Sequence, residues 1–544
     1  MVSSGWKRLS LAVLTVIARQ SLSYAQSTVP VKVADLGYAT YQTDLSLDEG
    51  VTSFLGIRYA AAPVGDLRFR APEPPESTSG IQNAITQPDE CFQGNVGLNS
   101  VSPFRKRTVN AQNEDCLFIN VHVPTDSDAN SNLPVVAWIH GGGYTAGSIG
   151  GSVPAPFPAQ TFVHSSNGSL VSVQIQYRLG AFGFLPGKAV ADDGALNAGL
   201  LDQQYALQWI QTHISKFGGD PTRVSIYGES AGAGSVLQHI VANGGNTQPR
   251  LFQSAMMSSP FLPFQYAYDD PVSEELYAEL LNRTNCTDRA LACLRTVDAT
   301  TLSQIGNAIE AANFFGVFTW VPVVDGKFSV ERPTVLLAER KINTDVALVF
   351  TNAHEGNIFV NSAELVANNT TLTEYITQLL VRLNDTSIQQ AVSLYSNIPG
   401  LTSIPQQAAQ VMGEVIFVCP AYFVLNAFDG HSSWKGEFAV PPATHGLDVL
   451  YVFADASVPA PPVNNSEFIG AFQQAFFDVA LSLDPNVHTS PIVTPEWPSY
   501  NADQEVMVFN VTEAHESDIA VVGPDTAQLE RCAFWQSLAA VNAQ

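Results

Sequence analysis

The feature that most constrains the fold is a five-residue motif between a strand-like run and a helix-like run. Residues Gly228–Gly232 read G-E-S-A-G; the apolar run Val224–Tyr227 precedes them, and a small residue, Ala233, follows. This G-x-S-x-G order is typical of a tight turn that lifts a serine above the end of a strand, with glycines that let strand and helix approach closely. Ser230 is therefore a candidate nucleophile, although the bare motif also arises by chance.

Runs of strand and helix character alternate around this motif. Val135–Ile139, Val171–Tyr177 and Val346–Phe350 are short β-rich runs, whereas Leu200–Phe217 has its apolar residues at helical spacing. Such alternation predicts a mostly parallel sheet with helices on both faces. The chain has 544 residues and no internal repeat or low-complexity tract, so we predict one domain over residues 26–544 rather than several average ones.

The charge balance excludes one class of partner. The chain has 25 Lys and Arg against 50 Asp and Glu, a formal net charge of -25. A protein with this balance repels nucleic acid and anionic lipid surfaces alike. We therefore predict that it binds no nucleic acid.

The first residues have the pattern of a secretory signal. Lys7 and Arg8 precede the apolar run Leu9–Ala18, and the small residues of Ser23–Ala25 suit a cleavage site after residue 25. An apolar run of this length is too short for a bilayer, which needs about 20 residues. We found no later stretch that is long and apolar enough, so we expect a secreted protein without a stable membrane anchor. The oligomeric state stays open.

Two further counts fit an extracellular protein. The six cysteines are an even number and contain no C-x-x-C pair, so three disulfides are expected rather than metal ligands, although sequence alone leaves about 15 pairings. Asn-X-Ser/Thr sequons predict glycosylated surface positions. The two overlapping sequons at 368 and 369 are not both expected to carry sugar. The sequons stand at Asn167, Asn282, Asn285, Asn368, Asn369, Asn384, Asn464 and Asn510.

A longer stretch around the serine resembles a known family. Residues Phe217–Gly232 fill every position of the serine signature of the type-B carboxylesterase/lipase family, which includes cholinesterases and fungal lipases. Glu114–Val121 resembles the second signature of that family, and the resemblance extends from about Val33 to Trp535. It implies an α/β-hydrolase fold, with a central, mostly parallel β-sheet flanked by helices and large loop insertions, and a carboxylic-ester hydrolase activity.

A serine nucleophile needs a base, and the base needs an acid that orients it. In α/β-hydrolases the chain order is Ser, then Asp or Glu, then His. His445 resembles the histidine turn of the family, just before the apolar run Val449–Phe453, which we predict to be a strand. Glu355 follows a predicted strand and matches the acid motif, whereas the adjacent His354 is expected to be a bystander. The triad is thus predicted as Ser230, Glu355 and His445; the alternatives are a solvated carboxylate and a structural imidazole.

The glycine run His140–Tyr144 follows a predicted strand, where only glycine lets the main chain approach a substrate closely. By resemblance this run and the residue after the serine supply the oxyanion hole, and the neighbours of the nucleophile organise the site. No metal and no organic cofactor is needed for this chemistry. The oxyanion-hole amides would be those of Gly142, Gly143 and Ala231, and the organising residues Glu229 and Ser258.

The resemblance also implies structural contacts far apart in the sequence. It implies two ion pairs, Arg68 with Glu114 and Arg178 with Asp202. It implies three disulfides, which join Cys91 to Cys116, Cys286 to Cys293 and Cys419 to Cys532.

The loop between the first two cysteines bears on the substrate. It is short and polar, contains Arg105–Arg107 and has neither the amphipathic helix of a lipid-activated lid nor the tryptophan that holds choline in cholinesterases. We therefore expect small to medium soluble esters, hydrolysed through an acyl-enzyme. The alternatives are an interfacial lipase or sterol esterase and, less favoured, an esterase-like binding protein without activity.

Overall fold

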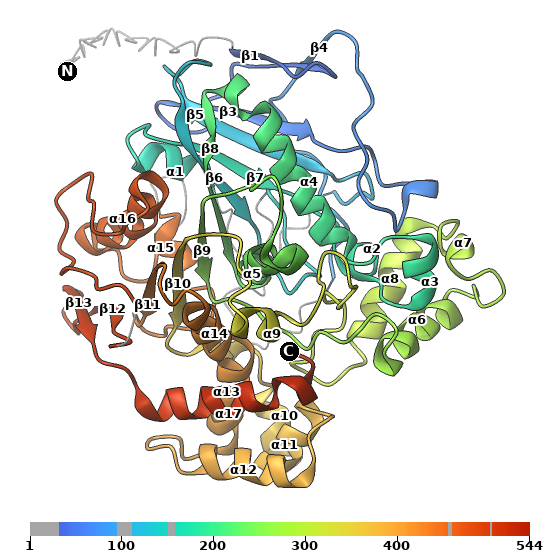
Figure 1. The fold of residues 1–544 in the computed structure, drawn as a ribbon, viewed down its shortest axis with the longest axis vertical. Helices are drawn as coiled ribbons and strands as arrows, with labels where there is room; N and C mark the ends of the chain where they lie inside the picture. The colour runs from blue at the N-terminus through green and yellow to red at the C-terminus, as the bar shows by residue number, and fades with distance from the viewer. Residues whose placement is uncertain (1–31, 95–110, 151–157, 455–459, 501–502) are drawn as a thin grey trace, which may run out of the picture.

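The computed structural model describes residues 32–94, 111–150, 158–454, 460–500 and 503–544 (Figure 1). The predicted signal at residues 1–25 and the basic run Arg105–Arg107 lie outside the described residues.

One large sheet organises the described part of the chain (Figure 1). All neighbours from β7 to β12 pair in parallel, and the antiparallel pairs lie at the two edges. This confirms the predicted mostly parallel sheet. In spatial order its strands are β13 (Ser517–Val522), β12 (Val506–Val511), β11 (Ser432–Phe438), β10 (Val346–Asn352), β9 (Ser254–Ser258), β8 (Gly219–Glu229), β6 (Leu133–Ile139), β7 (Val171–Ile175), β5 (Phe118–Pro124) and β3 (Val51–Arg58). A small second sheet contains β1 (Lys32–Asp35), β2 (Thr40–Thr43) and β4 (Ile81–Asn83).

Both faces of the large sheet are buried. In β6, Val135 and Ala137 belong to one apolar cluster, whereas Val136 and Trp138 between them belong to another. Successive strand residues point to opposite faces, so the two clusters are the cores on either side of the sheet. This is why the sequence of β6 is a continuous apolar run rather than an alternating one.

Helices cover each of these faces. The first cluster includes residues of α4 (Ala198–His213), α5 (Ala231–Gly245) and α14 (Cys419–Ala427). The second includes residues of α1 (Gln160–Ser165) and α16 (Ser466–Ser482). Figure 1 shows these two groups on opposite sides of the strands, as predicted.

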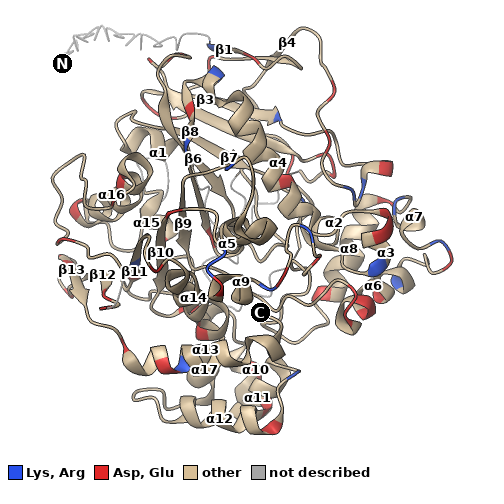
Figure 2. Cartoon of the chain, viewed as in Figure 1, with Lys and Arg blue, Asp and Glu red and all other residues tan. Residues whose placement is uncertain are grey.

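The remaining helices lie around this core. Figure 1 shows α10, α11 and α12 together at one end of the molecule, next to α13 and α17. Figure 2 shows that acidic positions are spread over many elements and that the basic positions do not gather on one face. The remaining helices are α2 (Gly180–Phe184), α3 (Lys188–Asp193), α6 (Pro271–Arg283), α7 (Ala290–Leu294), α8 (Ala299–Glu310), α9 (Pro333–Ala338), α10 (Ser362–Ala367), α11 (Leu372–Leu379), α12 (Asp385–Ser396), α13 (Ile404–Gly413), α15 (Val449–Val452) and α17 (Thr526–Asn542).

Two expectations about apolar segments were wrong. The run Val449–Phe453, predicted as a strand, forms the short helix α15, because four or five apolar residues satisfy either period and packing decides between them. A later segment, Ile404–Ala427, is long and apolar enough to cross a membrane, contrary to our expectation. It comprises α13, a π-helical turn at Glu414–Val418 (η5) and α14. Its most apolar window is 94% buried inside the protein, which is also typical of a core helix.

Long-range links follow the pairings that the resemblance implies. The three disulfides Cys91–Cys116, Cys286–Cys293 and Cys419–Cys532 are all present. Both ion pairs are buried and bidentate: Arg178 donates to Asp202 at 2.7 and 2.8 Å, and Arg68 donates to both carboxylate oxygens of Glu114.

Candidate active site

The candidate site lies where several parallel strands end at the same edge of the sheet. Ile139 at the end of β6 pairs with Gly228 of β8, and Glu229 pairs with Ser258 at the end of β9. Asn352, the last residue of β10, pairs with Phe438 of β11. The loops after these strands therefore meet at one edge, which is where ligands bind in open α/β sheets.

Ser230 occupies a sharp turn between β8 and α5. Its backbone has φ 56° and ψ -124°, which is unusual for a residue other than glycine, and its amide donates to the carbonyl of Ser258 at 2.9 Å. The flanking glycines are required by contact: a Cβ on Gly228 would lie 2.3 Å from the carbonyl carbon of Gly232, and one on Gly232 would lie 2.0 Å from the oxygen of Ile139. This is the strained turn that the motif predicts.

A backbone bridge brings the predicted acid and base together. His354 and Thr444 pair as an isolated parallel bridge, so the residues that follow them, Glu355 and His445, lie side by side. Nδ1 of His445 donates to Oε2 of Glu355 at 2.6 Å, and both side chains are buried. The side chain of His354 is exposed, so only its backbone takes part in this arrangement.

The second carboxylate oxygen of Glu355 is held by a residue that sequence reasoning did not assign. Ser259 Oγ donates to Oε1 at 2.6 Å, and the amide of Asn352 donates to the same oxygen at 2.7 Å. The expected organiser, Ser258, bonds other groups: its hydroxyl is 3.1 Å from that of Tyr227, and its carbonyl accepts from the amide of Ser230. The tandem serines were a visible signal, but only the fold shows which hydroxyl faces the acid.

The other nitrogen of His445 faces the nucleophile's neighbour. Nε2 is buried and lies 3.3 Å from Oε1 of Glu229, and within the described residues it has no hydrogen-bond partner. Nε2 of His445 therefore has no hydrogen bond to the hydroxyl of Ser230 in this structure. Catalytic hydrogen bonds are often long or misaligned before substrate binds, so this geometry is compatible with a base that engages the serine later.

Burial and charge set the protonation of this pair. Burial alone would lower the pKa of His445, but the charge of Glu355, its hydrogen bond and the charge of Glu229 outweigh it and raise the pKa above its ordinary value. Burial also raises the pKa of Glu229 to about 8. Burial of Glu229 thus opposes the negative charge through which this carboxylate acts on His445.

The glycine turn after β6 lies against the nucleophile. Gly142 and Gly143 have φ of 105° and 63°, a backbone region that favours glycine. A Cβ on Gly141 would lie 3.0 Å from Cβ of Ser230 and 2.6 Å from Oε2 of Glu229, so a larger residue would not fit there. Ala231 is the first residue of α5, where backbone amides have no acceptor within the helix. Gly141 and Ala231 thus adjoin Ser230, and the oxyanion-hole role of the amides of Gly142, Gly143 and Ala231 stays a prediction.

Aromatic rings form one wall beside the base. Phe417 and Phe359 have ring centroids 4.3 and 4.9 Å from that of His445. Phe261 and Phe318 continue this wall, with a centroid distance of 4.5 Å between them. The apolar surroundings exclude water from the imidazole and strengthen its interaction with Glu355.

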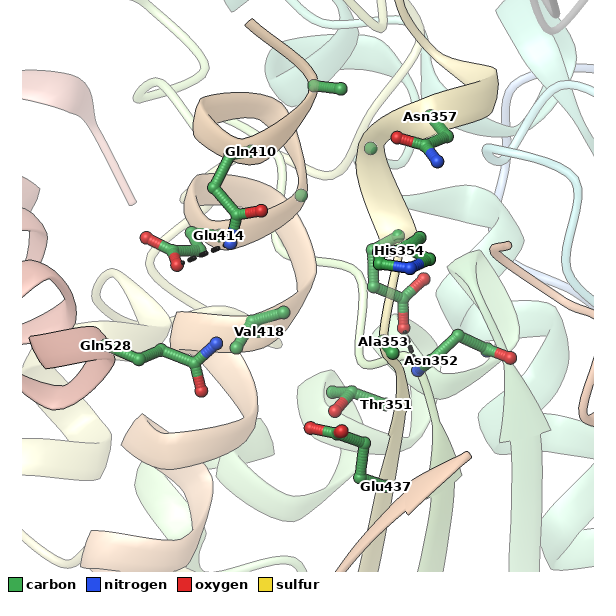
Figure 3. Close-up of a pocket in the computed structure, with 14 residues that line it drawn as sticks. Thr351, Asn352, Ala353, His354, Asn357, Gln410, Glu414, Val418, Glu437 and Gln528 are labelled. Carbon is green, nitrogen blue, oxygen red and sulfur yellow. Dashed lines mark hydrogen bonds between the residues drawn. The ribbon is translucent and has the colours of Figure 1, made fainter. Parts of the chain in front are cut away.

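A separate, small polar pocket of about 30 Å³ borders the other side of the segment that contains Glu355 (Figure 3). Glu355 contributes to its wall, and Figure 3 shows Gln410 and Glu414 on the helical segment opposite Asn357 and His354. In the described part of the chain, no group of three His, Cys, Asp or Glu side chains has an arrangement that could hold a metal ion.

Most sequon asparagines are accessible. All of the predicted glycosylation positions except Asn510, which is half-buried, are exposed. Exposure is what an attached sugar requires, and glycosylation itself stays a prediction.

Comparisons with known proteins identify the relatives of this chain. The sequence model of the carboxylesterase family matches residues 37–535. Secreted lipase 1 of Botryotinia fuckeliana is 28% identical, with 84% of this chain and 85% of that protein aligned. Acylcarnitine hydrolase of Mus musculus is 33% identical over 74% of each chain. The crystal structure of Aspergillus niger EstA superposes with a TM-score of 0.81 at 28% identity, covering 94% of this chain and 99% of that one.

Proposed function

The chain belongs to the carboxylesterase family and is a carboxylic-ester hydrolase, and we propose that Ser230, His445 and Glu355 carry its reaction as a catalytic triad. The observation that supports this most directly is the hydrogen bond of 2.6 Å between His445 Nδ1 and Glu355 Oε2. It fixes the imidazole tautomer so that Nε2 is free to accept a proton. The strained turn at Ser230 lies at the same edge of the sheet.

In the proposed reaction, Nε2 of His445 takes the hydroxyl proton of Ser230 as Oγ attacks the ester carbonyl. The negative charge that develops on the carbonyl oxygen is held by the amides of Gly142, Gly143 and Ala231. His445 then gives its proton to the departing alcohol, which leaves an acyl-enzyme. Water, deprotonated by His445, attacks the acyl carbon, and the acid leaves with Ser230 restored.

We propose small to medium soluble carboxylic esters as substrates and secretion as the localisation. The excess of acidic over basic residues and the signal-like first residues support secretion, and one relative is itself named a secreted lipase. The names of the relatives also favour a second candidate, a lipase that works at lipid interfaces. A rate that rises abruptly above the solubility limit of a triglyceride would favour the lipase, whereas saturation below that limit would favour the esterase.

The test of the triad is Ser230→Ala, with the exposed Ser537→Ala as its matched control. We expect kcat/KM on p-nitrophenyl acetate to fall by about 10⁴-fold or more in the first variant, because the nucleophile is lost, and to stay unchanged in the control. An organophosphonate probe should label Ser230 of the folded wild type. Undiminished hydrolysis by Ser230→Ala contradicts the triad, and absence of labelling favours an esterase-like binding protein.

A further inference from the structure

A cavity away from the triad has a lining that the hydrolysis of a simple ester does not use. It has a volume of about 530 Å³, within the size range of ligand sites. It lies between the segment after α8 and the helices α10 and α11. Figure 1 shows α10 and α11 at one end of the molecule.

The lining combines aromatic rings with short polar side chains. Phe314 and Phe315 are only half-buried, and the Phe314 ring packs on Tyr375 with a centroid distance of 5.7 Å. Amide side chains, among them Asn361 and Gln378, line the cavity as well. Several of the polar groups are oriented by local bonds: Asn313 donates to Thr319, Asn361 to Glu364 and Gln378 to the carbonyl of Glu374.

Two chain segments connect this cavity to the reaction centre. The segment 314–318 begins at the cavity with Phe314 and ends at Phe318, whose ring is 5.8 Å from that of Phe359. The Phe359 ring lies 4.9 Å from His445, and Asn361, two residues later, lines the cavity. Four residue steps span at most about 14 Å of extended chain, so the cavity begins within that distance of Phe318, and the Phe359 ring links Phe318 to His445.

Building on the proposed function, we propose that this cavity is a distal subsite for a neutral sugar carried on one half of the ester substrate, through a spacer that passes the Phe318 and Phe359 rings. A sugar presents C–H faces that pack on aromatic rings and hydroxyls that both donate and accept hydrogen bonds. Half-exposed phenylalanines beside amide and carboxylate groups match both properties.

The same lining disfavours the other ligand classes. An alkyl chain would take the amide and carboxylate groups out of contact with water and offer them no hydrogen bond in exchange, which is costly. An anion would find Glu364 and Glu374 and, among the described residues that line the cavity, no Lys or Arg. An ammonium group would use the two carboxylates, but Glu374 is exposed and already accepts hydrogen bonds from Thr371, so that attraction is screened by water.

Matched esters that differ only in their distal group test the proposal. The acid-side pair is methyl 3-(4-glucosyloxyphenyl)propanoate and its 4-methoxyphenyl analogue; the alcohol-side pair is the acetates of the two corresponding 3-arylpropanols. In one of the two pairs we expect the glucosylated ester to have a kcat/KM about 10-fold higher than its partner, chiefly because its KM is lower. This ratio should not change in 0.5 M NaCl, because the proposed ligand is neutral. A ratio near one in both pairs overturns the proposal, and so does a larger gain with a trimethylammonium group in place of glucose.

Two lining variants and one control locate the effect. Phe315→Ala and Gln378→Ala should each reduce the preference for the glucosylated ester to about 2-fold or less. Thr377→Ala, an exposed neighbour on α11 that does not line the cavity, should retain it. Retention of the preference in both lining variants overturns the proposal. If wild type hydrolyses p-nitrophenyl acetate but shows no sugar preference, the subsite fails and the esterase stands; if it hydrolyses neither, the proposed function itself fails.

A sugar attached to the chain itself could also occupy this cavity. Asn368 lines the cavity and begins a sequon. Mass spectrometry of the peptide that contains Asn368 and Asn369 in the secreted protein separates the two sources. An unmodified Asn368 leaves the cavity for the substrate, as we propose, whereas a glycan on Asn368 would fill it and overturn the proposal.

Discussion

Two glutamates in this protein are buried to a similar extent but have different roles. Glu414 in η5 is 1% exposed and Glu355 in the acid loop is 2% exposed. Glu414 accepts bonds from Arg531 at 2.6 and 2.8 Å, from Tyr395 at 2.6 Å and from Gln410 at 2.8 Å. Glu355 accepts bonds from a serine hydroxyl, a backbone amide and an imidazole.

The difference lies in the partner. Arg531 is a permanent cation that fixes the charge of Glu414, whereas His445 can gain or lose its proton and has a second nitrogen without a bond among the described residues. The backbone differs as well, since Ser230 and Ser259 have positive φ of 56° and 57°. A buried carboxylate thus stabilises the fold where its partner is a permanent cation. It supports chemistry where its partner can exchange a proton and the surrounding backbone is strained.

The largest expected effect is on the rate of Glu355→Gln. The neutral amide cannot stabilise the imidazolium and favours the wrong tautomer, so kcat should fall by about 10³- to 10⁴-fold. The melting temperature should change little by comparison. Glu437→Gln, which alters a half-buried carboxylate of the adjacent polar pocket, is the control and should keep its rate. A kcat within 10-fold of wild type would show that Glu355 is no more than structural.

Glu414→Gln should give the reverse pattern. It leaves the buried Arg531 guanidinium without its counter-charge, so we expect a loss of about 3–5 kcal/mol in the free energy of unfolding, measured by denaturant titration. The kcat per folded molecule should stay near that of wild type. Glu530→Gln, an exposed carboxylate beside Arg531 on the same helix, should change stability by less than about 0.5 kcal/mol. Equal stability of the two variants would contradict the structural role of Glu414.

Sequence predicted the parts of the site that are local or that follow chain order. The turn at Ser230 is specified by the glycines within two residues of it, which the close contacts of Gly228 and Gly232 explain. The positions of Glu355 and His445 followed from the order of the motif and the family resemblance, and the structure places these side chains in direct contact.

What sequence did not predict depends on contacts between distant segments. Ser259 meets Glu355 across 96 residues, and only the pairing of β9 with β10 places its hydroxyl there. The strand β11 contains Lys435, which is buried and donates to Thr351 at 2.7 Å. The polar sequence of β11 does not by itself predict a strand inside a sheet, because its place there depends on the strands β10 and β12 on either side. The helix α15 replaced a predicted strand for the same reason, since packing settled an ambiguous apolar run.

The smallest expected effect concerns Ser259, a positioning residue for Glu355. Its hydroxyl stabilises the ionised carboxylate; without it the carboxylate holds the imidazolium more strongly, so the already raised pKa of His445 should rise further. Because the base must be neutral, the acid limb of the kcat/KM pH profile should move to higher pH, by less than about one unit.

Ser259→Ala and Ser259→Gly together separate positioning from backbone strain. Both lack the hydroxyl, so both should show the same shift of the acid limb and a loss of about 5- to 10-fold in kcat/KM at pH 6, in line with one charge-assisted hydrogen bond. The alanine variant should be less stable than the glycine variant by about 1 kcal/mol, because glycine adopts the φ of 57° without cost whereas alanine does not. An acid limb that stays in place in both variants, while their stabilities differ, would reduce Ser259 to a purely structural part of the turn and leave His445 and Asn352 as the contacts that tune the acid.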